Sequence, residues 1–156
     1  MSTTAGILQF KVSFHCPEEI DFHSICREQG NVNSLSNNDV QMIQCMDNGK
    51  IFAITYGGGL NELSPMGLHS YQCKSFTQKN GLISDIIYSM HEDKQGNLWL
   101  VTGGGLVKFV ASAEQIQYSS EHIAFNMHFS EGVGATDGKQ IFFGTNRGLF
   151  YFTPEN

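Results

Sequence analysis

The chain has 156 residues, which suits one domain. Its formal net charge of −6 argues against a nucleic-acid partner, because no basic patch is present to neutralise phosphates. The 17 glycines, 12 phenylalanines and only 3 prolines favour a compact β-rich fold with many tight turns. No apolar run is long enough to span a membrane, so we expect no direct membrane insertion of this segment.

The predicted strands are short apolar and aromatic runs separated by turn residues. In chain order they cover 6–13, 21–26, 40–46, 51–55, 60–63, 70–76, 86–91, 98–101, 106–109, 115–118, 123–129, 140–145 and 149–152. Turn clusters at 47–50, 93–97 and 136–139 join neighbouring strands as tight hairpins.

The same pattern of strands and turns occurs three times. Ile51, Leu98 and Ile141 hold one equivalent position, separated by 47 and 43 residues. Two further sets of equivalent positions are Leu60, Leu106 and Leu149, and Thr55, Thr102 and Thr145. A period of about 45 residues with four short strands per unit is typical of a β-propeller blade. The sequence therefore predicts an all-β fold that is a fragment of a β-propeller.

At this period the chain makes about three and a half blades, whereas propellers usually have 4–8. We expect half a blade at 6–26, whole blades at 40–76 and 86–118, and an incomplete blade at 123–152, all in one partial propeller over 1–156. Such an arc would expose apolar faces and free strand edges at both ends. We therefore expect either the remaining blades of a larger propeller or self-association, since two such arcs would make a seven-bladed ring.

Most of the conspicuous residues are explained by the construction of a blade. Aspartates and glycines recur in the turns, threonines recur at one strand end, and the single tryptophan lies on a strand between two leucines, where it would pack between blades. These structural positions are Asp47, Gly49, Asp93, Gly96, Trp99, Thr102, Gly105, Leu106, Gly138, Thr145, Gly148 and Leu149.

This set of residues resembles the two-component regulator propeller repeat, which has a D-x-x-G-[NK]-[LI]-W-[LIV]-x-T core followed by G-G-L and an aromatic residue. The second unit matches most closely, whereas Phe52 stands in the first unit where tryptophan is usual. The resemblance covers roughly residues 30–154.

The resemblance implies part of the sensor region of a hybrid two-component system, of the kind found in Bacteroides-like gut bacteria. Such periplasmic propellers precede a membrane helix and a histidine kinase that starts a phosphorelay, and they typically detect oligosaccharides. We accordingly expect a non-catalytic sensing module, with any kinase lying outside this chain. No signal peptide is visible, so we expect a periplasmic segment of a membrane-anchored parent, or a cytoplasmic protein if the chain is complete.

Ligand binding is expected in the loops that precede each inner strand, because propellers gather these loops at one end of the central axis. Their amides, carboxylates and hydroxyls could hydrogen-bond a glycan. The candidate residues are Asn37, Asn38, Asp39, Ser84, Asp85, Glu121 and His122.

No enzymatic constellation, metal site or cofactor is predicted. The six histidines show no HxH or HxxxH spacing, and the glycine triplets are not followed by the lysine of a phosphate-binding loop. Cys45 and Cys73 lie in apolar runs and are interpreted as buried thiols, while a disulfide between Cys16 and Cys26 is left open. A scaffold for protein–protein interaction is the main alternative function. A lyase-type propeller enzyme is the third, although the recurring His/Glu pair expected of one is missing.

Overall fold

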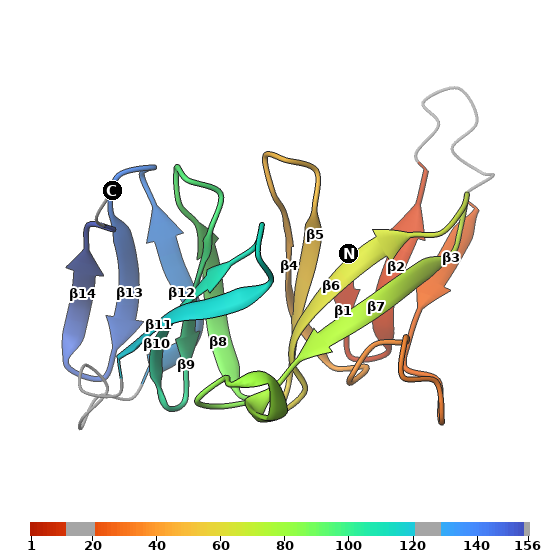
Figure 1. Ribbon diagram of the computed structural model, residues 1–156, viewed down its shortest axis with the longest axis horizontal. Coiled ribbons are helices and arrows are strands. Elements are labelled where there is room, and N and C mark those ends of the chain that lie inside the picture. The colour runs from red at the N-terminus through yellow and green to blue at the C-terminus, as the bar shows by residue number, and fades with distance from the viewer. Residues whose placement is uncertain (12–20, 121–128, 155–156) are drawn as a thin grey trace.

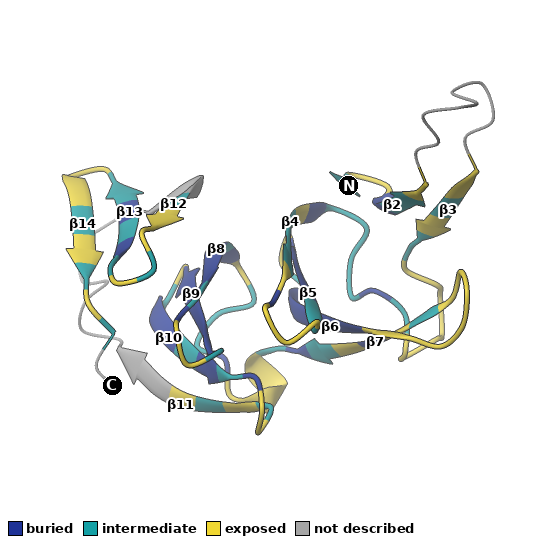
Figure 2. Ribbon diagram, turned by 90° about the horizontal axis from the view of Figure 1, so that it is seen from above, coloured by how far each residue is buried: buried dark blue, intermediate teal, exposed yellow. Residues whose placement is uncertain are grey.

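The computed structural model describes residues 1–11, 21–120 and 129–154, and it confirms the predicted all-β fold. Four antiparallel sheets contain every described strand, and the remaining regular element is one short 3-10 turn, η1 (Gln78–Asn80). Figures 1 and 2 show the four sheets following one another in sequence order along an open arc. Among the described residues, no helix has the length and apolar character needed to cross a membrane.

Each sheet is built from strands that are consecutive in the sequence. Sheet A contains β1 (Ser2–Thr3), β2 (Gly6–Phe10) and β3 (Phe22–Ile25). Sheet B contains β4 (Val40–Cys45), β5 (Ile51–Thr55), β6 (Gly59–Pro65) and β7 (Tyr71–Phe76). Sheet C contains β8 (Ile87–Glu92), β9 (Leu98–Thr102), β10 (Gly105–Val110) and β11 (Gln115–Ser120). Sheet D contains β12 (Phe129–Thr136), β13 (Ile141–Thr145) and β14 (Gly148–Phe152).

The first strands of sheets B, C and D lie beside one another, so that β4, β8 and β12 line the inner side of the arc, and β1 contacts β4. This arrangement is that of propeller blades around an axis. Strand β1 was not predicted, because two residues are too short to show any periodicity. It is held by a local turn in which the Thr3 hydroxyl donates to the Gly6 carbonyl oxygen over 2.8 Å.

The first strand of sheet D differs from the prediction. The strand expected at 123–129 falls on residues outside the described part of the chain, except for Phe129. The described strand that pairs with β13 is β12, whose sequence FSEGVGAT has no regular alternation of apolar and polar residues. One of its two glycines is explained by packing, because a Cβ on Gly134 would lie only 2.1 Å from His91 Nε2 on β8.

The central core lies between sheets B and C. Phe109 on β10 is fully buried and makes edge-on contacts with Phe52 (5.8 Å between ring centroids) and with Phe76 (4.8 Å). These three rings belong to one cluster with buried aliphatic side chains from both sheets, including Ile54, Leu98 and Leu100. Each sheet therefore covers the apolar face of its neighbour, which is how blades bury both of their faces.

A second core joins sheets C and D. Trp99 is 7% exposed and packs against Phe152 with 4.6 Å between ring centroids. Ile141 and Phe143 on β13 complete this cluster with Val101 and Leu106.

His91 lies at the contact between β8 and β12, where its protonation is expected to affect stability. Within the described residues, its buried Nε2 has no hydrogen-bond partner, and burial lowers the pKa of His91 below its usual 6.5. The unfolded chain therefore binds a proton more readily than the folded chain does, so the stability present above about pH 6.5 is lost as the pH falls towards the pKa of the folded state. We expect urea denaturation to show a smaller free energy of unfolding at about pH 5.5 than at about pH 7.5.

His91→Leu is the matched variant, since it replaces the titrating imidazole with an apolar side chain that suits the buried site. The stability of the variant should fall less over the same pH interval. An equal fall in the wild-type protein and the variant would show that His91 is not responsible.

Candidate functional site

The predicted binding loops lie where β4 and β8 begin. Asn37, Asn38 and Asp39 precede β4, and Ser84 and Asp85 precede β8. Because β4 and β8 are adjacent inner strands, the two loops are neighbours at the ends where these strands begin. Glu121 and His122 lie outside the described residues.

Backbone groups of these loops hold consecutive sheets together. The Gly6 N–H donates to the Asn38 carbonyl oxygen over 2.7 Å, and the Gly59 N–H donates to the Asp85 carbonyl oxygen over 3.0 Å. Gly59 has φ +73°, and a Cβ there would lie 2.2 Å from the Phe76 carbonyl oxygen, so only glycine fits. Asn38 and Asp85 therefore hold equivalent positions between successive blades.

Several of the predicted side chains also make local hydrogen bonds. The Asn37 amide donates to the Tyr56 carbonyl oxygen over 2.8 Å, and the Asn38 side-chain oxygen accepts from the Arg27 N–H over 2.6 Å. The Ile86 N–H donates to Ser84 Oγ over 3.1 Å, and the Gln78 N–H at the start of η1 donates to Asp85 Oδ1 over 2.7 Å.

These bonds order the loops and leave only part of each side chain for a ligand. Asp39 Oδ1 accepts from the Gln41 side chain over 2.7 Å. Among the described residues, the other carboxylate oxygens of Asp39 and Asp85 have no hydrogen-bond partner.

A small hollow lies between β4 and β8, near the start of both strands. Its lining residues are Gln41, Tyr56, Ile86, Ile87 and Tyr88. Tyr56 is 51% exposed, so part of its ring is accessible to a ligand. Sequence reasoning missed the hollow, although an aromatic residue directly before a glycine triplet was a usable signal.

The turn residues of the second unit form a hydrogen-bond network centred on the Asp93 carboxylate. Asp93 Oδ1 accepts from the backbone N–H groups of Gln95 (3.0 Å) and Asn97 (2.9 Å), and Oδ2 accepts from the Trp99 indole N–H (2.9 Å). One carboxylate thus joins the turn to the tryptophan, which explains why Asp, Asn and Trp occur together in this unit. In the first unit the Asp47 N–H instead donates to the Glu92 carboxylate of the next sheet.

Glycines and threonines close the hairpins in the same way in different units. Gly49, Gly96 and Gly138 have φ of +83°, +73° and +80°, so each turn uses a left-handed residue. The Thr102 hydroxyl donates to the Gly105 carbonyl oxygen over 2.8 Å, and the Thr145 hydroxyl donates to the Gly148 carbonyl oxygen over 2.9 Å.

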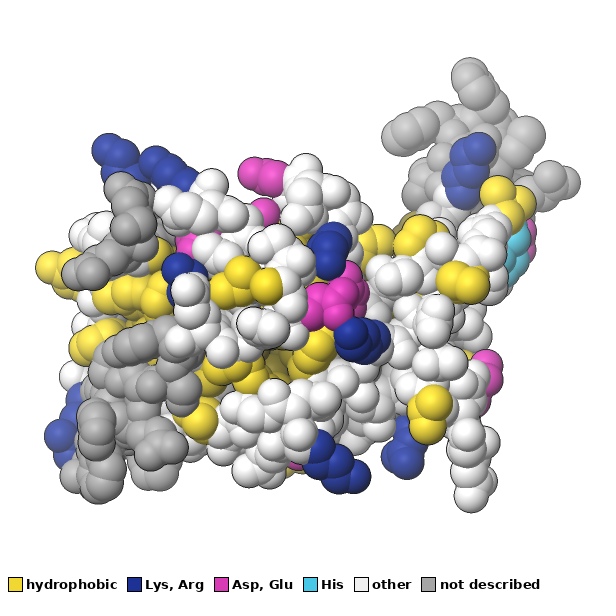
Figure 3. Space-filling view, viewed as in Figure 1, with side chains coloured by type: hydrophobic (Ala, Val, Ile, Leu, Met, Phe, Trp, Pro, Cys, Tyr) yellow, Lys and Arg dark blue, Asp and Glu magenta, His cyan; other side chains and the backbone are white. Residues whose placement is uncertain are grey.

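The leucines at the equivalent position of the three units differ in exposure, and the difference shows which sheet lacks a covering neighbour. Leu60 and Leu106 are 0% and 2% exposed, whereas Leu149 on the last described strand is 71% exposed. Tyr151 on the same strand is 57% exposed, and Figure 3 shows hydrophobic side chains gathered over the β13–β14 end. A leucine at a core position of the repeat is exposed because no described sheet follows sheet D.

The cysteines correct one prediction. Cys26, Cys45 and Cys73 are free thiols, and Cys16 lies outside the described residues. Cys73 is buried, and burial raises the pKa of its thiol to about 11. Cys45 is exposed, so its interpretation as a buried thiol is wrong: it is the last residue of β4, and the buried residue is its neighbour Met46.

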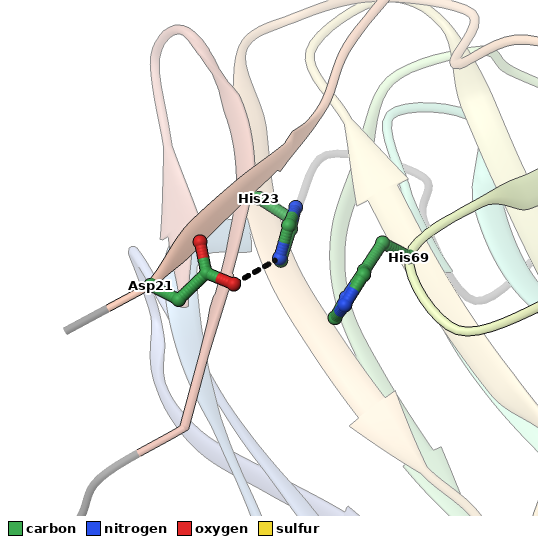
Figure 4. Close-up of side chains that lie close together, drawn as sticks. All are labelled: Asp21, His23 and His69. Atoms are coloured by element: carbon green, nitrogen blue, oxygen red, sulfur yellow. Dashed lines mark hydrogen bonds and ion pairs between the residues drawn. The ribbon is translucent and has the colours of Figure 1, made fainter.

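A side-chain cluster at the outer rim was also missed. Asp21 and His23 from the β3 segment lie beside His69 from the loop between β6 and β7 (Figure 4). His23 Nε2 and Asp21 Oδ2 are 3.0 Å apart, and the two imidazole rings are stacked with centroids 3.5 Å apart. The spacing rules applied to the sequence consider only ligands that are near in the chain, and His69 is far from the other two.

Comparison with known proteins supports the resemblance seen in the sequence. The family model described as "Two component regulator propeller" matches residues 81–104, while the comparison with curated proteins gives no match. The fold of the chain is similar to that of a solved structure described as the extracellular domain of a hybrid two component system from B. thetaiotaomicron. The TM-score is 0.72 at 15% identity, over 99% of this chain and 21% of that chain.

A second extracellular domain of a hybrid two component system from the same organism aligns with a TM-score of 0.49 at 20% identity, over 87% of this chain and 25% of that chain. The chain thus spans about a fifth to a quarter of the length of these solved domains. Residues 81–104 therefore match the two component regulator propeller repeat, within a chain that has the fold of about a fifth of the first of these extracellular domains.

Proposed function

We propose that this chain is a non-catalytic part of the periplasmic sensor propeller of a hybrid two-component system. The observation that carries the proposal is the propeller repeat at residues 81–104, set in a fold that aligns over 99% of its length with an extracellular domain of such a system. The buried polar groups support a structural role, since Asp93, Asn97 and Thr102 all make hydrogen bonds within their own hairpins.

We further propose that an oligosaccharide binds across the surface where β4 and β8 begin, since the hollow there, of about 10 Å³, is too small to enclose a sugar ring. Aromatic rings present flat apolar faces that suit the C–H faces of sugar rings, and Tyr56 and Tyr88 line the hollow there. The carboxylate of Asp39 lies next to the same hollow through its hydrogen bond from Gln41, and a carboxylate oxygen accepts hydrogen bonds from sugar hydroxyls.

A glycan array probed with the complete ectodomain tests this function. Tyr56→Ala should reduce binding of any glycan that is captured by about tenfold or more, because stacking on an aromatic ring is removed while the backbone bonds of Tyr56 remain. Leu68→Ala is the control, since Leu68 is also exposed but lies in the loop between β6 and β7, away from this end of β4 and β8. Capture of no glycan, or equal binding by both variants, would remove the support for a sugar site here.

Leu149 and Tyr151 on β14 are apolar side chains that remain exposed at the β13–β14 end of the arc. We propose that further blades cover Leu149 and Tyr151, supplied by the rest of a longer polypeptide or by a second copy of this chain. Light scattering on the isolated chain distinguishes the two sources: a dimer supports the second copy, and a stable monomer supports further blades in the same polypeptide.

A further inference from the structure

The cluster of Asp21, His23 and His69 offers three metal-binding atoms in one place. One ligand atom from each residue lies within 4.8 Å of the others. Figure 4 shows the carboxylate and the two imidazoles side by side, with His69 reaching the pair from a separate segment. Nothing in the proposed sensing function requires this cluster, which lies at the outer strand of sheet A, away from the inner strands.

The fold explains how three residues distant in sequence meet. Residues 21 and 23 are two apart at the start of a strand, so their side chains leave the same face. The loop at 66–70 between β6 and β7 lies beside β3 in both Figure 1 and Figure 2, which carries His69 from sheet B to sheet A. The cluster therefore bridges two consecutive blades.

The ligand types are those of a transition-metal site. Two imidazole nitrogens and one carboxylate oxygen form a common ligand set for Zn²⁺, with a fourth position left for water. A tetrahedral ion with bonds of about 2.0–2.1 Å keeps its ligand atoms about 3.3 Å apart. Asp21 Oδ2 and His23 Nε2, at 3.0 Å, are already close to this spacing.

His69 has to move only slightly to complete the site. Its nitrogen must approach by roughly 1.5 Å at most, and its ring must tilt out of the stack on His23, for a tetrahedral arrangement. The loop that carries it is open to solvent, since Met66 and Leu68 are 66% and 85% exposed. Such a loop has few packing contacts to lose when it adjusts.

We propose that Asp21, His23 and His69 bind a divalent transition-metal ion of the Zn²⁺ class, and that the bound ion ties the outer edge of sheet A to sheet B. Lys11 lines the same hollow, and its positive charge opposes a cation there, whereas the Asp21 carboxylate is the charge that favours one. Because the three ligands converge only in the folded chain, metal binding favours the folded state.

Calorimetric titration of the full chain with Zn²⁺, after removal of any affinity tag, tests the site. We expect one ion per chain with micromolar or tighter affinity and a raised unfolding temperature. His69→Ala and Asp21→Asn should each weaken binding by about tenfold or more. Both residues are exposed, and circular dichroism of each variant checks that the fold is kept.

The matched control is Cys45→Ser, which removes an exposed thiol that could bind Zn²⁺ by itself. Retained binding in this variant supports the site, as does a Co²⁺ complex whose spectrum shows nitrogen and oxygen ligands without a thiolate charge-transfer band. The proposal is overturned by an absence of binding to the wild-type chain, by retained binding in His69→Ala, or by loss of binding in Cys45→Ser. The metal titration uses no sugar, so its result does not depend on whether the proposed sensing function is correct.

Discussion

Replacing Phe109 by alanine should lower the free energy of unfolding by about 3–5 kcal/mol, the cost typical of removing a large aromatic side chain from a core. Phe109 is fully buried between sheets B and C, and its ring contacts those of Phe52 and Phe76. The cavity would open between two blades that each depend on the other for cover, so collapse of the surroundings can fill it only in part. Urea denaturation followed by circular dichroism measures the change.

Phe22→Ala is the matched control, because it deletes the same atoms from a side chain that is 57% exposed. Its effect should be below about 1 kcal/mol, since most surface of the ring already meets water. Similar losses in the two variants would mean that the interface between sheets B and C is not the main source of stability.

The second large effect is expected for Asp93→Ala, which should cost roughly 2–4 kcal/mol. Asp93 is 8% exposed, and its carboxylate accepts hydrogen bonds from the Asn97 N–H and the Trp99 indole N–H. Removing the carboxylate leaves buried donors without this acceptor, and water cannot easily replace it in a closed turn. Asp93→Asn should give an intermediate loss, because one oxygen acceptor remains.

Asp137→Ala provides the comparison at the equivalent turn of the third unit. The Lys139 and Gln140 N–H groups donate to the Asp137 carboxylate, and these bonds, chiefly that from Gln140, lower the pKa of Asp137. Since this turn is open to solvent, water can satisfy the same donors, and the variant should lose much less stability than Asp93→Ala does. Chemical denaturation of both variants under one set of conditions checks the order, and an equal loss at the two turns would contradict the role given to burial.

Except for the first strand of the third unit, strand positions in the repeated units were predictable to within a residue or two. The strand predicted at 51–55 is β5 (Ile51–Thr55), and that predicted at 98–101 is β9 (Leu98–Thr102). A strand with both faces buried needs a run of apolar residues, and a hairpin turn needs a left-handed glycine; both requirements are visible in the sequence. Repetition strengthened each assignment, because an error in one unit would disagree with the other two.

The prediction was weakest where contacts with another sheet decide the local structure. β12 is a strand although its sequence contains two glycines, and the Gly134 position is explained only by the nearby ring of His91. In the same way, Cys45 lies in an apolar run and is nevertheless exposed, whereas the next residue, Met46, is 3% exposed and belongs to the core between sheets B and C.

The sequence by itself determined the all-β class, the repeated blade unit and the turn chemistry, because each depends on residues near one another in the chain. Only the tertiary structure showed that the Asn38 and Asp85 carbonyl groups join consecutive sheets, that Tyr56 lies in a hollow beside Asp39, and that His69 meets His23. These contacts depend on how each blade is placed against the next. That placement follows from burial of whole sheet faces, and no local pattern in the sequence encodes which side chains then become neighbours.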